Sequence, residues 1–310
     1  RPVFWTVAIL ALTHFVIIHG VRSGIERASK MMMPTLFVLL VVVVIGSCML
    51  PGAGKGVEFL FRPDFSKMDS SVFLAAMGQS FYSLSIGMGC ICTFASYFSR
   101  KANLMKSAVN IVAIDSLIAI MAGLMIFPAA FSVGINPDSG PSLIFITLPN
   151  VFKEAFATMP IIGTVIAIMF YVLLSLAALT SLISLHEVST AFFYEEMHTT
   201  RKKAATLVTV SLCVLGALCS LSIGGRDWLV IGGKSLFDLL DFVTGQIMLP
   251  IAGFLTCIFL GWVVPRQTVK DEFTNWGTLR STLFGVYILL IRYVCPVCIV
   301  AIFLNQFGII

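Results

Sequence analysis

The sequence of 310 residues is poor in charged side chains. Asp, Glu, Lys and Arg make up 11% of it, and hydrophobic residues make up 58%, whereas a soluble domain carries roughly 25% charged residues. A chain this apolar cannot bury its hydrophobic surface in one water-soluble core, so a bilayer must solvate part of it. The net charge is only +5 and the basic residues lie in short clusters between apolar runs, which argues against a nucleic-acid-binding surface.

Patterns of metal, disulfide and catalytic chemistry are also lacking. The four histidines form no metal-ligand pattern, and the eight cysteines fall inside or at the edges of apolar runs, where cysteine serves as a small hydrophobic residue. Cys295-Pro-Val-Cys298 has redox spacing, but it lies in a lipid-length run without strand–helix context. No nucleophile–base pair is legible, which argues against an enzyme.

Apolar runs of about 20 residues predict eight membrane-spanning helices. The segment from Pro160 to His186 contains no Asp, Glu, Lys or Arg, and its run is long enough to cross the bilayer and project beyond it. The long loop 133–160 carries three prolines, which predict short broken helices. The predicted spans are 4–19, 31–50, 71–98, 107–132, 161–194, 205–224, 242–264 and 282–306.

Lysines and arginines are unevenly shared between alternate loops. Loops 20–30, 99–106, 195–204 and 265–281 hold twelve of these residues. The segments on the opposite side of the membrane hold seven. Positive residues favour the cytoplasm, so these four loops are predicted to be cytoplasmic and both chain ends external. Since the sequence begins Arg1-Pro2 without an initiator Met, we expect further spans upstream, odd in number if the N-terminus is cytoplasmic. Arg292 lies within the last span and is expected to snorkel or to pack against protein.

The third span is predicted to break near its middle. Ser83, Ser85, Gly87 and Gly89 lie close to the midpoint of 71–98, and both residue types weaken a helix. Non-helical backbone at membrane depth is tolerated only where it is buried in protein or lines a cavity. Half-helix ends then offer N–H groups to an anion and carbonyls to a cation, as in a transporter site. A small-residue packing face is the alternative.

Two further intramembrane features point to a cation. Asp115 is the only ionisable side chain in span 107–132, and a carboxylate at that depth is expensive unless it is functional. Thr180 and Ser181 place adjacent hydroxyls in the middle of the fifth span, where they can serve as hard oxygen ligands. The alternative for both hydroxyls is a bond back to their own helix. His186 and Glu187, near the inner end of this span, are expected to face a wet interior, and a proton relay is the alternative.

Six short motifs, in a fixed order, resemble the neurotransmitter:sodium symporter family. They are Gly24-Ile25-Glu26-Arg27 with Lys30 and Met33-Pro34, Arg62-Pro63-Asp64-Phe65, the run from Gly78 to Gly89, Phe145-Ile146-Thr147-Leu148-Pro149, Leu179-Thr180-Ser181, and Lys234-Ser235-Leu236 with Asp238 and Asp241-Phe242. The resemblance covers nearly the whole chain and implies an all-α integral membrane protein of the leucine-transporter-like inverted-repeat fold.

On this resemblance, the eight spans correspond to the family's fourth to eleventh helices, with three helices upstream. Residues 1–50 are the end of the first inverted repeat, 71–264 are the second repeat, and 282–306 are an additional C-terminal helix. The chain is thus expected to form one polytopic domain, 1–310, of a multi-pass protein of the plasma or inner membrane.

The resemblance also implies the roles of individual residues. The amino-acid pocket is lined by Tyr82, Ser83, Ser85, Met88, Ser181 and Leu185. One sodium site takes Ser83 and Asp115, and a second takes the Ala177 carbonyl, Thr180 and Ser181. Gln79 and Asp241 belong to the outer gate, and Glu195 belongs to the inner gate. Since the family often has Asn where Asp115 stands, the carboxylate is expected to replace chloride.

The function implied is sodium-coupled symport of a neutral amino acid by alternating access. Met88 and Leu185 suggest a hydrophobic substrate. The other partners expected are two sodium ions and membrane lipid, without nucleic acid. Two alternatives stay open: a non-transporting packing subunit of a membrane assembly, and an intramembrane enzyme that uses His186, Glu187 and Asp115.

Overall fold

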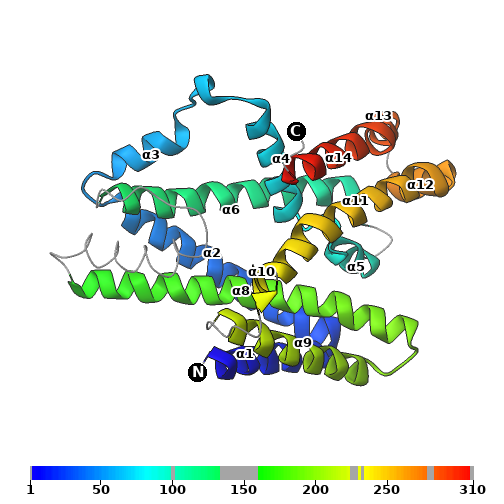
Figure 1. Ribbon diagram of the computed structural model, residues 1–310, viewed down its shortest axis with the longest axis horizontal. Coiled ribbons are helices and arrows are strands. Elements are labelled where there is room, and N and C mark those ends of the chain that lie inside the picture. Colours follow the sequence, from blue (N-terminus) through cyan, green and yellow to red (C-terminus); the bar gives the residue numbers. More distant parts are fainter. Residues whose placement is uncertain are drawn as a thin grey trace. The chain divides into compact units, whose positions relative to one another are not determined.

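The chain is described by a computed structural model over residues 2–98, 102–132, 160–223, 230–231, 234–277 and 283–307. Contacts divide it into two units, and Figure 1 labels their elements. The first unit comprises Arg1–Ile18, Lys67–Val112 and Ser184–Ile310, and the second comprises His19–Ser66 and Ala113–Ile183. The predicted loop helices of 133–160 and the motif at 145–149 lie outside the described residues, apart from Pro160.

The second unit is built on three long apolar helices. They are α2 (Arg27–Cys48), most of α6 (Leu104–Ser132) and the first part of α8 (Pro160–Glu196). A π-helical turn, Val21–Glu26, precedes α2, and a short helix, α3 (Ala53–Phe61), follows it. The core of this unit comes from all three long helices: Leu40, Val43, Met125, Ile166, Phe170 and Leu173.

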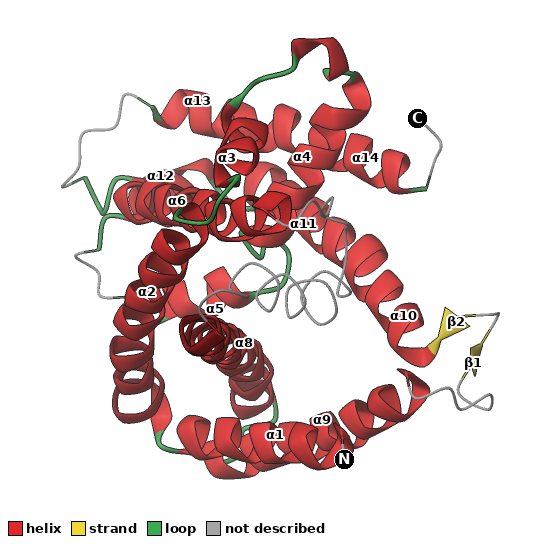
Figure 2. Cartoon of the chain, turned by 90° about the vertical axis from the view of Figure 1, so that its left-hand side faces the viewer, coloured by secondary structure: helices red, strands yellow, loops and turns green. Residues whose placement is uncertain are grey.

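The first unit begins with α1 (Pro2–Ile18), which runs beside α9 (Arg201–Ile223), as Figure 2 shows. A two-stranded antiparallel ribbon, β1 (Val230–Ile231) and β2 (Lys234–Ser235), follows α9. The remaining helices are α4 (Ser70–Ser83), α5 (Cys90–Ser96), α10 (Leu236–Asp241), α11 (Leu249–Ile258), α12 (Arg266–Phe273), α13 (Phe284–Leu289) and α14 (Cys295–Gln306).

Most predicted spans correspond to helices of the structure. Among the described residues, six helical stretches are long and apolar enough to cross a membrane: Gly24–Cys48, Leu104–Ser132, Ile161–Glu196, Arg201–Ile223, Leu236–Val263 and Phe284–Gln306. The first predicted span forms the apolar helix Pro2–Ile18, and the third is interrupted. The predicted multi-spanning helical architecture is therefore confirmed.

Three π-helical segments interrupt the last two spans: Phe242–Met248, Phe259–Val263 and Leu290–Val294. π-helical turns widen the backbone ladder and expose carbonyls to other donors. Arg292 uses one of them, because its Nε donates to the Gly261 carbonyl at 2.5 Å. Its guanidinium also lies 5.5 Å from the Trp262 ring centre, at a distance that suits a cation–π contact. Arg292 thus packs against protein, which is one of the two arrangements that the sequence led us to expect.

Candidate functional site

The predicted break in the third span is present. α4 ends at Ser83, and α5 begins at Cys90. Between them, φ is +53° at Ser85, +85° at Gly87 and +79° at Gly89. These left-handed values cannot continue a right-handed helix, and a residue with a side chain adopts them only at a cost. The serines and glycines from which the break was predicted are therefore the residues at which the helix is interrupted.

The break packs closely against α11. A Cβ added to Gly87 would lie 2.5 Å from the Leu249 carbonyl oxygen, so the backbones approach in a way that only glycine permits. One turn further along α11, the ring of Phe81 fills the space beside Gly253, where it leaves no room for a Cβ. Phe81, Leu249 and Ile299 form a buried cluster, and Met88 packs against it.

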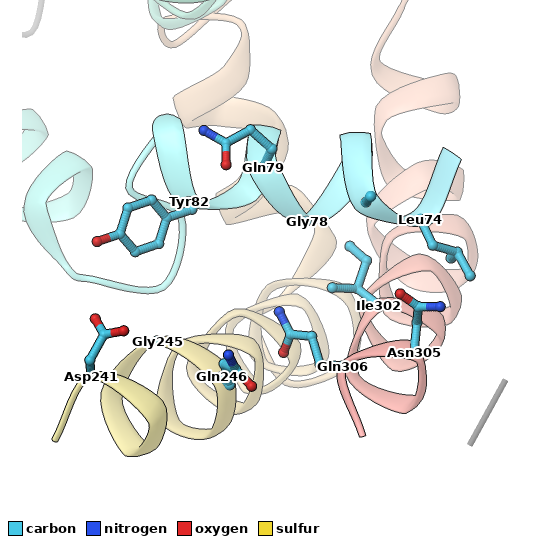
Figure 3. A pocket seen from close by; sticks show the side chains of 11 residues that line it. Leu74, Gly78, Gln79, Tyr82, Asp241, Gly245, Gln246, Ile302, Asn305 and Gln306 are labelled. Atoms are coloured by element: carbon cyan, nitrogen blue, oxygen red, sulfur yellow. The ribbon is translucent and has the colours of Figure 1, made fainter. Parts of the chain in front are cut away.

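A cleft of about 320 Å³ lies beside the first half of the broken helix. Figure 3 shows Gln79 and Tyr82 on α4, with Asp241 and Gln246 on the helix across the cleft. Gln79 and Asp241, both predicted to belong to the outer gate, thus line one cleft together with Tyr82, a predicted pocket residue. The other lining residues are Leu74, Ala75, Gly78, Gly245, Ile302, Asn305 and Gln306.

The other predicted pocket residues on this segment lie around the break, away from the cleft lining. Ser83 is the exposed last residue of α4, and Ser85 is half-buried within the break. Met88 faces the Phe81 cluster described above. Of the predicted pocket residues Tyr82, Ser83, Ser85 and Met88, Tyr82 is the one that lines this cleft.

The predicted oxygen ligands on α8 lie on one part of the helix. The Thr180 hydroxyl lies 2.8 Å from the Ala177 carbonyl and donates to it, so the bond back to its own helix, which was the alternative, is present. Ser181 is exposed, as is Leu185 one turn later. Asp115 is half-buried on α6 in the second unit, to which Ala177, Thr180 and Ser181 also belong, while Ser83 and Leu185 belong to the first unit.

The inner part of α8 differs from the prediction. Glu187 has no exposed surface and His186 is 1% exposed, so the expected wet surroundings were wrong. The Tyr97 hydroxyl donates to Glu187 Oε1 at 2.8 Å, and Arg201 Nη2 donates to Glu187 Oε2 at 2.5 Å. Buried carboxylates require such partners. We call Tyr97, Glu187 and Arg201 the carboxylate cluster.

Sequence reasoning missed Tyr97 and Arg201 as partners of Glu187. One signal was available: Glu187 is an acidic residue directly after a long run without charge, and Arg201 begins the next helix. A buried acid and a cation at the same membrane face are expected to pair. Glu195, the predicted inner-gate residue, is exposed near the end of α8.

Comparisons with known proteins agree with this architecture. The family model "Sodium:neurotransmitter symporter family" matches residues 2–309. An uncharacterised sodium-dependent transporter of Haemophilus influenzae is 35% identical over 98% of this chain and 65% of its own length. The uncharacterised sodium-dependent transporter YhdH of Bacillus subtilis is 35% identical over 97% of this chain and 66% of its own length. The chain therefore spans slightly less than two thirds of these relatives.

A solved structure gives the same result for the fold. The crystal structure of MhsT in complex with L-phenylalanine is 37% identical to this chain, with a TM-score of 0.83 over 98% of this chain and 68% of MhsT. The predicted leucine-transporter-like fold is thereby confirmed, as is a multi-pass membrane protein.

Proposed function

Because the chain belongs to the sodium:neurotransmitter symporter family, we propose that it forms most of a symporter that carries a neutral, hydrophobic amino acid with sodium. The family consists of transporters and not of enzymes. The observation that carries the proposal is the interrupted third span, whose break at residues 84–89 lies next to the Tyr82 cleft. A break at membrane depth supplies the polar backbone groups that an amino acid requires.

The amino acid is proposed to bind at the break. Backbone groups around Ser83 and Ser85 are suited to its ammonium and carboxylate, since half-helix ends carry partial charges of both signs. Met88 and Leu185 are assigned to its apolar side chain, and Ser181 on α8 is assigned to the same pocket. Tyr82 is proposed to cover the site, because its ring reaches the cleft that Gln79 and Asp241 also line. The likeness to MhsT, solved with L-phenylalanine, supports an apolar substrate.

Two sodium ions are proposed as the coupled cargo. Ser83 and Asp115 are assigned to one site, and the Ala177 carbonyl, Thr180 and Ser181 to the other. The oxygens of Ala177 and Thr180 lie 2.8 Å apart, close enough for one small cation to contact both when the hydroxyl proton turns away. Sodium and potassium differ in size, and a site of fixed oxygens selects by that difference. Asp115 is proposed to supply the negative charge that chloride provides in chloride-dependent relatives.

The intramembrane-enzyme alternative is not supported. His186 and Glu187 are both engaged by neighbouring side chains, and the chain's relatives are transporters. No observation favours a non-transporting packing subunit over a symporter.

A thermal-shift screen of the full-length protein against twenty amino acids, with sodium and with choline, tests the proposal. A ligand that binds only the folded state raises the unfolding temperature by mass action. We expect stabilisation by large apolar amino acids in sodium alone. Equal stabilisation in sodium and in choline contradicts sodium coupling, and stabilisation by charged amino acids alone contradicts the proposed substrate class.

A further inference from the structure

A chain of hydrogen bonds crosses three helices of the first unit at the inner part of α8. His14 Nδ1 on α1 and His186 Nε2 on α8 each lie 2.8 Å from Thr209 Oγ1 on α9. On its other side, His186 Nδ1 lies 3.0 Å from Thr190 Oγ1. We call His14, Thr209, His186 and Thr190 the histidine seam. Neither the proposed substrate site nor the proposed sodium sites use any of these residues.

Proton accounting assigns the ring nitrogen of each histidine that donates to Thr209. The Thr209 hydroxyl has one proton and two lone pairs, and its three neighbours are the two ring nitrogens and the Ala205 carbonyl, 2.8 Å away. A carbonyl only accepts, so the hydroxyl proton goes to Ala205. Both ring nitrogens must then donate: His14 carries its proton on Nδ1 and His186 on Nε2. When His186 is neutral, its Nδ1 accepts from the Thr190 hydroxyl, and every contact of the seam is satisfied.

The His186 end of the seam is buried and adjoins the carboxylate cluster, whereas His14 and Thr209 are half-buried. His186 is 1% exposed and Thr190 is 0% exposed, so a change of proton state there cannot be compensated by bulk water. Glu187, the next residue, is held by Tyr97 and Arg201. Arg201 Nε also donates to the Ile17 carbonyl of α1 at 3.2 Å. Seam and cluster therefore join the same three helices, α1, α8 and α9.

The charged and titratable groups around His186 are few. His14 faces it from α1, and Arg201 lies near it on α9. Tyr97 and Glu187 complete the surroundings through their contacts with Arg201. A proton on His186 adds a second cation near Arg201, the residue that pairs with the Glu187 carboxylate. It also turns Thr190 from a donor into an acceptor.

We propose that the histidine seam is a proton-sensitive positioning device for transport. With both rings neutral, the seam keeps α1 and α9 bonded to α8, and the Glu187 carboxylate keeps its bonds to Tyr97 and Arg201. A proton that enters the seam places a second cation near Arg201 and repels it, which loosens the three helices and slows the transport cycle. His14, His186 and Thr209 act through Arg201 and its pair with Glu187, and they touch no substrate. The predicted effect on transport rests on the proposed symport function, whereas the predicted tautomers do not depend on it.

Nuclear magnetic resonance of the full-length protein with ¹⁵N-labelled histidine tests the seam directly. At pH 8 we expect His14 as the Nδ1–H tautomer and His186 as the Nε2–H tautomer, each assigned by the signal lost in His14→Gln or His186→Gln. The Thr209→Val variant, which removes the shared hydroxyl, should shift both signals. A doubly protonated His186 at pH 8, or His14 protonated on Nε2 instead, overturns the proposal.

Amino-acid uptake at pH 7.5 and 5.5 tests the consequence. Wild-type uptake should fall about threefold or more on acidification, because a proton on His186 places a second cation near Arg201. Gln at position 186 can donate to Thr209 and accept from Thr190 but cannot gain a proton. His186→Gln should therefore keep uptake at pH 7.5 and lose the acid response, whereas His186→Leu should lose uptake at both values. His198→Gln, at an exposed histidine, should behave as wild type.

An identical acid response in wild type and His186→Gln overturns the proposal, and so does a wild type without an acid response. If no amino acid is taken up under any condition, the proposed symport function fails. The tautomer measurement still decides the seam in that case, so the two failures are distinguishable.

Discussion

The Glu187 carboxylate and the Arg201 guanidinium form an ion pair inside the first unit. Glu187 has a fully buried side chain, whereas the side chain of Arg201 is 22% exposed. The loss of one partner of such a pair leaves an uncompensated buried charge, which typically costs about 3–5 kcal/mol. The loss of both charges costs far less stability, because no unpaired charge stays buried.

This ion pair predicts the order of the unfolding temperatures of three variants of the detergent-solubilised full-length protein. Arg201→Gln should lower the unfolding temperature most, since it strands the carboxylate. Glu187→Gln should have a smaller effect because Arg201 reaches water, and the double variant Glu187→Gln/Arg201→Gln should be more stable than Arg201→Gln alone. Additive losses in the double variant would show that the two side chains do not depend on each other.

The helix break should tolerate no side chain at Gly87. Its φ of +85° and the 2.5 Å approach to Leu249 both exclude a Cβ, so Gly87→Ala should abolish substrate binding or lower the yield of folded protein severely. Gly285→Ala is the matched control, because nothing lies within 4 Å of an added Cβ there. Ligand-induced thermal stabilisation measures the effect. Full stabilisation of Gly87→Ala by substrate would show that the break does not form the site.

Thr180→Val and Ser181→Ala should weaken apparent sodium affinity. A dry sodium site needs several oxygen ligands, and a loss of about 1.4 kcal/mol from one contact corresponds to tenfold. Ser175→Ala is the control, because this exposed hydroxyl also bonds to its own helix, at the Tyr171 carbonyl, but is not assigned to a site. Sodium titrations of substrate binding should separate the two groups. An unchanged midpoint in both site variants removes these residues from sodium coordination.

Asp115 should make transport independent of chloride. If its carboxylate supplies the negative charge, uptake in chloride and in gluconate should be the same for the wild type. Asp115→Asn should then lower uptake or make it respond to chloride. A wild type that stops transporting when chloride is withdrawn refutes this role.

Much of the fold could be predicted because the bilayer requires long apolar helices. The run without charge from Pro160 to His186 became one helix, α8, and the serines and glycines of the third span became its break. The helix α3 was not predicted, since Ala53–Phe61 is too short for a span. The π-helical segments were not predicted either, because apolar periodicity does not distinguish them from α-helix.

The site was less predictable where it depends on tertiary contacts. The surroundings of Glu187 could not be inferred, because Tyr97 is 90 residues away in sequence. The shared hydroxyl of Thr209 brings together two histidines from different helices, a relation that spacing cannot reveal. By contrast, Gln79, Tyr82 and Asp241 were identified through the family resemblance, and the structure places them on one cleft.

The most direct test of the central claim is uptake of labelled L-phenylalanine or L-leucine into liposomes that contain the full-length protein. An inward sodium gradient should accumulate the amino acid above its external concentration, and collapse of the gradient with equal sodium on both sides should abolish the accumulation. Tyr82→Ala should weaken uptake at the same gradient. Equal accumulation with and without the sodium gradient, or none for any neutral amino acid, would contradict the account.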